Sequence, residues 1–256
     1  MLMSKKLIYD IPLTKIAIRK GIKLPVELNN DLAYLCGVFA GDGSISIEKR
    51  NNQYKYYLTY TGNALDEKEF YHEIIAPRLR NVFGIEPKVK HNKRDNTYVS
   101  RINSKPIILF LTEIIGLPKG KKYDFLKIPE LFLREESLVI NFIRGLFDTD
   151  GCISFKKRDK PFPYYPVICL SSKSRKFLLQ IAIFLKEMGF KFSKVYTYRV
   201  NDVRFKLGYN IISRIELSGH NNLKLWRDKV DFFSPKHLLK IKKYWKIAEG
   251  RLPYLC

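Results

Sequence analysis

Two aspartates stand out because each ends the same short motif. Asp42 is the last residue but one of the stretch LCGVFAGDG at residues 35–43, and Asp150 is the last but one of IRGLFDTDG at residues 143–151. Each aspartate falls at the predicted C-terminal end of a helix, where the helix dipole disfavours a carboxylate, and two such carboxylates side by side also repel. Bound divalent cations remove both penalties, and oxygen-only ligands suit Mg²⁺ or Mn²⁺. The pattern therefore predicts a metal site with Asp42 and Asp150 as ligands.

Small residues in the two motifs predict that the motif helices pack closely. They lie one turn apart on one helix face, as Gly37 and Gly41 in the first copy and Gly145 and Thr149 in the second. Small side chains let two helix backbones approach, which predicts a pseudo-twofold pair with the two aspartates brought together. The glycines after the aspartates, Gly43 and Gly151, are expected to be left-handed helix caps.

One motif position differs in chemistry between the copies. Ala40 and Asp148 share it, so an acid is dispensable there, and we interpret Asp148 as a local structural residue or one that supports the metal ligands from behind. A single Asp-Gly after a helix is commonly only a turn. Two copies in one context on a basic chain favour a functional site instead.

The elements around the motifs repeat in the same order, which predicts an α+β fold of two αββαββα halves. Alternating polar and apolar residues predict antiparallel strands, and Pro77 is expected to kink or split the first long helix. The predicted strands are 44–49, 54–61, 87–92, 97–103, 152–157, 165–171, 194–200 and 211–217, and the later helices are 66–83, 105–115, 174–188 and 222–230. We divide the chain into an N-terminal extension (1–30), a first half (31–116), a joining segment (117–136) and a second half (137–256).

Alternate residues of the predicted strands form polar faces that could read nucleic acid. Counting in twos from each aspartate gives one face of the strand that follows, and such side chains can reach base edges in a major groove. The expected contacts are Ser46, Glu48, Arg50, Ser154, Lys156 and Arg158, joined on later strands by Lys88, Lys90, Arg101, Tyr196, Tyr198 and Arg204. The opposite face, with Ile45, Ile47, Ile153 and Phe155, is expected to pack on helices.

Composition favours a polyanionic partner. The 256 residues carry a formal net charge of +22, and a field of that size attracts nucleic acid. No apolar run long enough to span a membrane is present, so we expect no membrane partner. The four cysteines are scattered without a CxxC pair and the first residues lack a signal peptide, which predicts an intracellular, reducing compartment without a zinc site or disulfide framework.

The paired motifs, the strand after each and the repeat length together resemble the LAGLIDADG homing endonucleases in their single-chain, two-motif form. The resemblance covers about residues 31–245. It implies that the four-stranded sheets of the two halves form a saddle over DNA, and that Asp42 and Asp150 bind the catalytic metals. It adds the backbone carbonyls of Gly41 and Thr149 as further metal ligands.

The resemblance also implies one basic residue near the scissile phosphates in each half. Gly120-Lys121-Lys122 ahead of Ile128-Pro129 is similar to the family's segment in the first half, and we choose Lys122, with Lys121 as the nearest competitor. In the second half, the stretch 234–237 (SPKH) looks like the equivalent loop, which selects Lys236.

These observations predict a Mg²⁺-dependent endonuclease, with Mn²⁺ able to substitute, that cuts both strands of a long asymmetric DNA site. The resemblance implies that the cuts leave 3′ overhangs. We expect an intron-encoded monomer. The alternatives are an RNA maturase that binds intron RNA, and a non-catalytic DNA-binding regulator on the same fold. The four histidines make no HNH-like cluster, and the terminal residues Met1 and Cys256 argue against an intein.

Overall fold

The computed structural model describes residues 6–156, 165–203 and 206–249. By packing, the chain divides into two compact units, Met1–Thr149 and Asp150–Cys256. Each unit contains one four-stranded antiparallel sheet covered by helices, which confirms the predicted α+β class. Within the described residues, none of the helices is long and apolar enough to cross a membrane.

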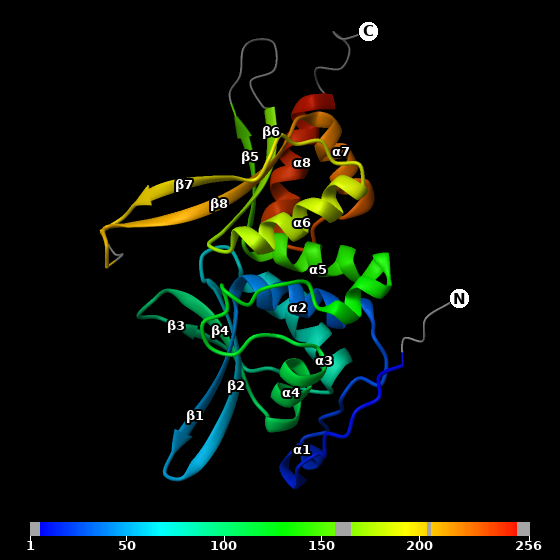
Figure 1. Cartoon of the computed structure of the whole chain (residues 1–256), viewed down its shortest axis with the longest axis vertical. Coiled ribbons are helices and arrows are strands. Elements are labelled where there is room, and N and C mark those ends of the chain that lie inside the picture. The colour runs from blue at the N-terminus through cyan, green and yellow to red at the C-terminus, as the bar shows by residue number, and fades with distance from the viewer. Residues whose placement is uncertain (1–5, 157–164, 204–205, 250–256) are drawn as a thin grey trace. The chain divides into compact units, whose positions relative to one another are not determined.

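The sheet of the first unit has the strand order β1-β2-β4-β3. Its strands are β1 (Gly43–Arg50), β2 (Gln53–Asn63), β3 (Val89–Asn92) and β4 (Thr97–Asn103). One face buries Ile45, Leu58 and Ile102, as period-two alternation requires. Ile47 was expected on this buried face but is 37% exposed, because the far end of the β1–β2 hairpin extends past the covering helices (Figure 1).

The helices of the first unit follow the predicted order. They are α1 (Lys15–Arg19), α2 (Asn30–Asp42), the π-helical turn η1 (Phe70–Ile75), α3 (Ala76–Phe83), α4 (Lys105–Leu109), the π-helical turn η2 (Phe110–Ile114), the 3-10 turn η3 (Glu130–Arg134) and α5 (Glu136–Thr149). Pro77 lies in the first turn of α3, directly after η1. Ile75 and Ala76 both keep helical backbone angles, so the predicted helix is not split there but changes from π-type to α-type hydrogen bonding.

The two motif helices, α2 and α5, pack side by side within the first unit (Figure 1). A Cβ built on Gly37 would lie well under 3.0 Å from the carbonyl oxygen of Phe142, and one on Gly145 would clash in the same way with the carbonyl oxygen of Tyr34. Glycine is therefore needed where the two backbones meet. Because α5 packs on α2, the boundary between the two compact units falls after α5, at Thr149. The division into two sequence repeats, with the second half starting at residue 137, stays a prediction.

Tyr34 and Asp148 add a buried polar contact between α2 and α5. The Tyr34 hydroxyl donates to the Asp148 carboxylate at 2.7 Å, and both side chains are fully buried. Burial, the charge of Asp148 and the hydrogen bond to it raise the pKa of Tyr34 well above its usual value, so the hydroxyl keeps its proton. This contact supports the interpretation of Asp148 as a structural residue.

Gly43 and Gly151 are not left-handed caps, so that prediction is wrong. Gly43 is extended, with φ −88° and ψ 156°, and Gly151 is not among the described glycines of positive φ. A Cβ at Gly43 would lie 2.5 Å from the Phe39 Cα. Glycine is required here because the chain enters β1 while still pressed against the last turn of α2.

The second unit repeats the sheet with the order β5-β6-β8-β7. Its strands are β5 (Gly151–Lys156), β6 (Tyr165–Ser172), β7 (Tyr196–Asn201) and β8 (Tyr209–Ser218), and its helices are α6 (Arg175–Glu187), α7 (His220–Lys229) and α8 (Pro235–Glu249). Ile153 is buried and Phe155 stacks on Tyr244 of α8 with ring centroids 4.9 Å apart, so the apolar face of β5 packs on helices as expected.

Helix α8 corrects the prediction of a loop at residues 234–237. Pro235 begins the helix, and the Ser234 carbonyl accepts backbone hydrogen bonds from His237 and Leu238. Proline at the first helical position costs no hydrogen bond, because that N–H has no partner in the helix. Lys236 therefore lies in the first turn of a helix.

The N-terminal extension packs on the first unit. Lys6 and Glu27 form an antiparallel bridge, the Tyr9 ring meets the Phe110 ring edge-on at 5.3 Å, and the Lys23 N–H donates to the Phe83 carbonyl at 3.0 Å. The extension therefore adds surface next to α3 and β3.

Candidate functional site

Asp42 and Thr149 line one groove of the first unit, at the C-terminal ends of α2 and α5. The groove has a volume of about 510 Å³, and its other lining residues are Thr61, Gly62, Asn63, Leu65, Glu67, Asp95, Asn96 and Thr97. Asp150 is the next residue after Thr149 along the chain. The first of the two predicted metal ligands and the residue before the second therefore share one groove.

Tyr71 and Glu67 border Asp42 and were not foreseen from the sequence. Tyr71 is fully buried, and burial together with the charges of Asp42 and Glu67 raises the pKa of its hydroxyl well above the usual value. Glu67 is 4% exposed and accepts a hydrogen bond from the Asn63 N–H at 2.6 Å. Their only sequence signal is a tyrosine and a glutamate in the segment after β2, which is too common to single them out.

Lys122 is buried at the C-terminal end of α2, with 8% of its surface exposed. Its ammonium donates to the carbonyls of Phe39 at 3.0 Å and Gly43 at 2.8 Å, and also to that of Gly41. An ammonium has three donors, and here each has a carbonyl acceptor. Lys122 therefore supplies positive charge where the helix dipole and Asp42 are negative.

The predicted metal ligands at this end of α2, the Asp42 carboxylate and the Gly41 carbonyl, are both oxygens, which suit a hard cation. The carbonyls of Phe39 and Gly43 accept from Lys122. Within the described residues, no three His, Cys, Asp or Glu side chains group as a metal site. A Mg²⁺ ion held here would take its other ligands from water or phosphate, which is its common mode of binding.

Lys236 lies near the start of β5. Its charge acts on the Cys152 thiol, whose pKa is lowered to about 6, first by a hydrogen bond with Cys169 and further by Lys240, Arg214 and Lys236. Cys152 is the second residue after Asp150. The first turn of α8 therefore places a positive charge beside the strand that Asp150 precedes.

The first sheet has an open face that gathers most of the predicted contacts of the first half. The strand register places Ser46 opposite Tyr57, Glu48 opposite Lys55, and Arg101 opposite Thr59. The Arg101 guanidinium lies over the Tyr57 ring, 5.0 Å from its centroid. Partners in register point to the same side of a sheet, so Lys55, Tyr57 and Thr59 join this face. Arg50 lies on it opposite Gln53 and Lys90 opposite Val99.

The second sheet has a corresponding open face. Ser154 and Lys156 lie on it, and the Lys156 ammonium forms an ion pair with Glu216 of β8 at 3.5 Å. Tyr196 is in register with Arg214, and the Tyr196 and Tyr198 rings lie 5.7 Å apart. Arg158 and Arg204, two further predicted contacts, lie outside the described residues.

Lys88 and Arg101 also line a groove with Lys20 of the N-terminal extension. The groove has a volume of about 480 Å³ beside β3 and β4, and Ile22, Ile85, Glu86, Pro87, Ile102 and Asn103 complete it. Lys20 was not predicted to contact a partner. The Lys20 side chain is exposed. The sequence alone could not predict its position next to Arg101, because that position depends on how the N-terminal extension folds.

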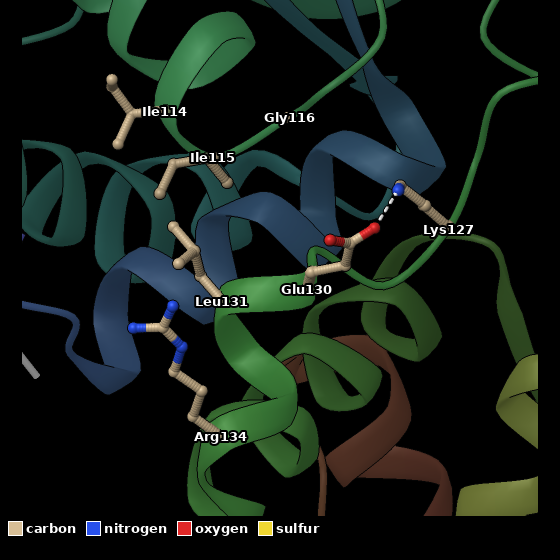
Figure 2. A pocket seen from close by; sticks show the side chains of 7 residues that line it. All are labelled: Ile114, Ile115, Gly116, Lys127, Glu130, Leu131 and Arg134. Carbon is tan, nitrogen blue, oxygen red and sulfur yellow. Dashed lines mark hydrogen bonds and ion pairs between the residues drawn. The ribbon is translucent and has the colours of Figure 1, made fainter. Parts of the chain in front are cut away.

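A further pocket in the first unit, shown in Figure 2, contains none of the predicted site residues. It has a volume of about 310 Å³ between η2 and η3 and is bordered by an ion pair of Lys127 and Glu130 at 2.6 Å. The rest of its lining consists of aliphatic side chains, Gly116 and the Arg134 guanidinium.

A duplicated αββαββα fold whose two motif helices pack through glycine, with a carboxylate at the C-terminal end, defines a class of two-repeat α+β proteins. This chain belongs to the LAGLIDADG-like domain family, which matches residues 29–116 and 137–229. The expected family is thereby confirmed.

Solved structures share the fold. The homing endonuclease I-DmoI in complex with DNA and Ca aligns with a TM-score of 0.55 and 18% identity, over 84% of this chain and 97% of that chain. Another structure of I-DmoI contains DNA and Mn.

Several curated relatives are much longer than this chain. A probable translation initiation factor IF-2 of Methanocaldococcus jannaschii is 27% identical over 210 residues, which are 79% of this chain but 16% of the factor. The tRNA-splicing ligase RtcB of Methanopyrus kandleri is 29% identical over 139 residues, which are 52% of this chain and 13% of the ligase.

Proposed function

We propose that this chain is a site-specific double-strand DNA endonuclease that hydrolyses phosphodiesters with divalent metal ions. The observation that carries the proposal is the glycine-mediated pairing of α2 and α5, which brings Asp42 and the residue before Asp150 to one groove. If the two carboxylates lie side by side at these helix ends, as we propose, they would destabilise the chain unless cations were bound there.

The known proteins that this chain resembles support a mobile nuclease. I-DmoI, which shares the fold, is a homing endonuclease and was solved with DNA. The matched segment also makes up a small part of an initiation factor and of an RNA ligase. The activities that these two proteins are named for are unrelated to each other. A segment shared by such different proteins is not the source of either named activity, which supports a module inserted into host genes. Those segments are parts of the translated factor and ligase, and for this chain we propose an intron as the carrying element instead.

Different residues of the chain would bind the metal and stabilise charge during cleavage. Asp42 and Asp150, with the carbonyls of Gly41 and Thr149, would hold Mg²⁺, which when bound polarises the phosphate and lowers the pKa of its water. Lys122 and Lys236 would each add positive charge near a scissile phosphate, which stabilises charge that develops in the transition state.

The open faces would bind the DNA. Arg101, held over Tyr57, and Lys90 would lie against the duplex in the first half, with Lys156 and Tyr198 in the second. Contacts between lysine or arginine and phosphate release counterions, so affinity should fall steeply with salt. Because the halves differ in sequence, the target is asymmetric, and cleavage across the minor groove leaves 3′ overhangs.

A cleavage assay tests the metal assignment. Wild-type protein is incubated with Mg²⁺, Mn²⁺ or EDTA and a duplex made by joining the two sequences that flank the reading frame. We expect both strands to be cut with either metal and neither with EDTA. Asp42→Asn and Asp150→Asn should each lower the rate at least about 100-fold.

Asp95→Asn is the matched control, since Asp95 lines the same groove and accepts a hydrogen bond from Asn92. It should cleave within about threefold of wild type. Wild-type rates in both aspartate variants would show that the ligands are wrong. Sedimentation with and without DNA tests the proposed monomer, and fractionation of the source cells tests the proposed intracellular location.

A further inference from the structure

Two thiols that the proposed chemistry does not use face each other on the open face of the second sheet. Cys152 on β5 and Cys169 on β6 are direct partners in the antiparallel register. Residues opposite each other in such a pair have Cα atoms about 4.5 to 5.5 Å apart, and disulfides span Cα separations of about 4.4 to 6.8 Å. The backbone therefore already holds the two residues at bonding distance.

The side chains also lie on one face. Directly opposite residues of an antiparallel pair point to the same side of the sheet, so the Cys152 and Cys169 thiols are neighbours there. Cys152 is exposed and open to a reagent from solution, whereas Cys169 is 5% exposed. This difference gives the two thiols separate parts in an exchange reaction.

A fixed positive charge lies against the buried sulfur. Arg214 donates from Nη2 to the Cys169 Sγ at 3.0 Å, and Glu216 holds the guanidinium by an ion pair at 3.0 Å. A guanidinium beside a sulfur stabilises the negative charge that the attacking sulfur carries.

We propose that Cys152 and Cys169 are a redox modification site that forms a reversible cross-strand disulfide with a small-molecule disulfide such as glutathione disulfide as the oxidant. The deprotonated Cys152 sulfur attacks one sulfur of the oxidant, forms a mixed disulfide and releases one glutathione. The deprotonated Cys169 sulfur then attacks the Cys152 sulfur, forms the cross-strand bond and releases the second glutathione. Two protein thiols are oxidised, and one disulfide is reduced to two thiols.

The site does not depend on the proposed nuclease activity, and its test uses neither DNA nor metal. The full chain is equilibrated with mixtures of reduced and oxidised glutathione, quenched with acid, alkylated and mapped by mass spectrometry without reduction. We expect a linked peptide of Cys152 and Cys169 and the loss of two alkylatable thiols per chain, both reversed by excess reduced glutathione. Full alkylation of both thiols at every ratio, or links mainly to Cys36 or Cys256, would overturn the proposal.

Two single variants separate the roles of the thiols. Cys169→Ser should accumulate one glutathione on Cys152, because the second thiol is missing. Cys152→Ser should leave Cys169 at least about tenfold less modified than that, because Cys169 is buried. Equal glutathione adducts in the two variants would contradict the assigned order. Cys36, 1% exposed in α2, is the internal control and should stay unmodified.

Discussion

The two motif helices end in different ways, although their sequences are related by the repeat. At the end of α2, Lys122, which comes from a segment distant in the sequence, donates hydrogen bonds to the carbonyls of Phe39, Gly41 and Gly43. At the end of α5, a side chain of the helix itself is the donor: the Thr149 hydroxyl donates to the carbonyls of Gly145 at 3.1 Å and Leu146 at 3.0 Å. The lysine chosen in the second half, Lys236, is half-buried in the first turn of α8.

The difference shows that matching positions in a repeat can carry different structural duties. Lys122 holds together the end of the helix that carries Asp42, in addition to any part in cleavage. Lys236 lies where its charge reaches the start of β5, and the end of α5 has its own hydroxyl cap.

The largest predicted effect is the loss of stability on replacing Lys122. Lys122→Met leaves three carbonyls without their cationic donor, and the free energy of unfolding should fall by about 4 kcal/mol. Lys236→Met should lower it by about 1 kcal/mol or less. Urea titrations in EDTA, without DNA, measure both. Equal losses of unfolding free energy in the two variants would contradict the proposed difference between the two helix ends.

The glycine contacts of α2 and α5 should behave alike, in contrast to the lysines. Gly37→Ala and Gly145→Ala each push a methyl group into a backbone carbonyl of the other helix, which should cost about 3 kcal/mol in either variant. Thermal unfolding followed by circular dichroism compares them, with Lys176→Ala, an exposed position on α6, as the control. A loss in only one variant would show that the helix contact is less symmetric than the structure indicates.

The Tyr34–Asp148 bond has an apolar counterpart in the repeat, because Phe142 and Ala40 occupy the related positions. Tyr34→Phe removes the hydroxyl that Asp148 accepts from, and should cost about 2 kcal/mol. The double variant Tyr34→Phe with Asp148→Ala copies the Phe–Ala combination and should recover most of that loss. A double-mutant cycle in urea measures the recovery; additive losses would contradict the pairing.

The smallest effect concerns the groove that the N-terminal extension adds to the first half. Lys20→Ala should lower DNA affinity by about threefold and make the salt slope shallower by roughly one, as expected for a single phosphate contact. Lys224→Ala, an exposed lysine on α7, is the matched control and should bind like wild type. Fluorescence anisotropy at several salt concentrations distinguishes them, and identical slopes for all three proteins would exclude Lys20 from the interface.

Periodicity was enough to predict the strands, because alternation of apolar residues such as Ile45 and Ile153 depends only on local sequence. It missed α8, since Ser234-Pro235 reads equally as a turn and as a helix start. The prediction of a left-handed cap at Gly43 is wrong because the chain turns straight into β1 while still packed on Phe39, four residues earlier, where a Cβ would clash. The position of Lys122 could be matched by resemblance, but its three carbonyl partners depend on how an aperiodic segment folds back on α2.

The Tyr34–Asp148 contact also decides which helix can pair with which. If α2 met α2 from another copy, Tyr34 would lie opposite Ala40 and its hydroxyl would lose the carboxylate. If α5 met α5, Asp148 would lie opposite Phe142, and a buried carboxylate would lose its donor, which is costly. Only α2 with α5 satisfies both groups. One buried hydrogen bond thus discriminates against exchange of motif helices between copies and favours pairing within a chain.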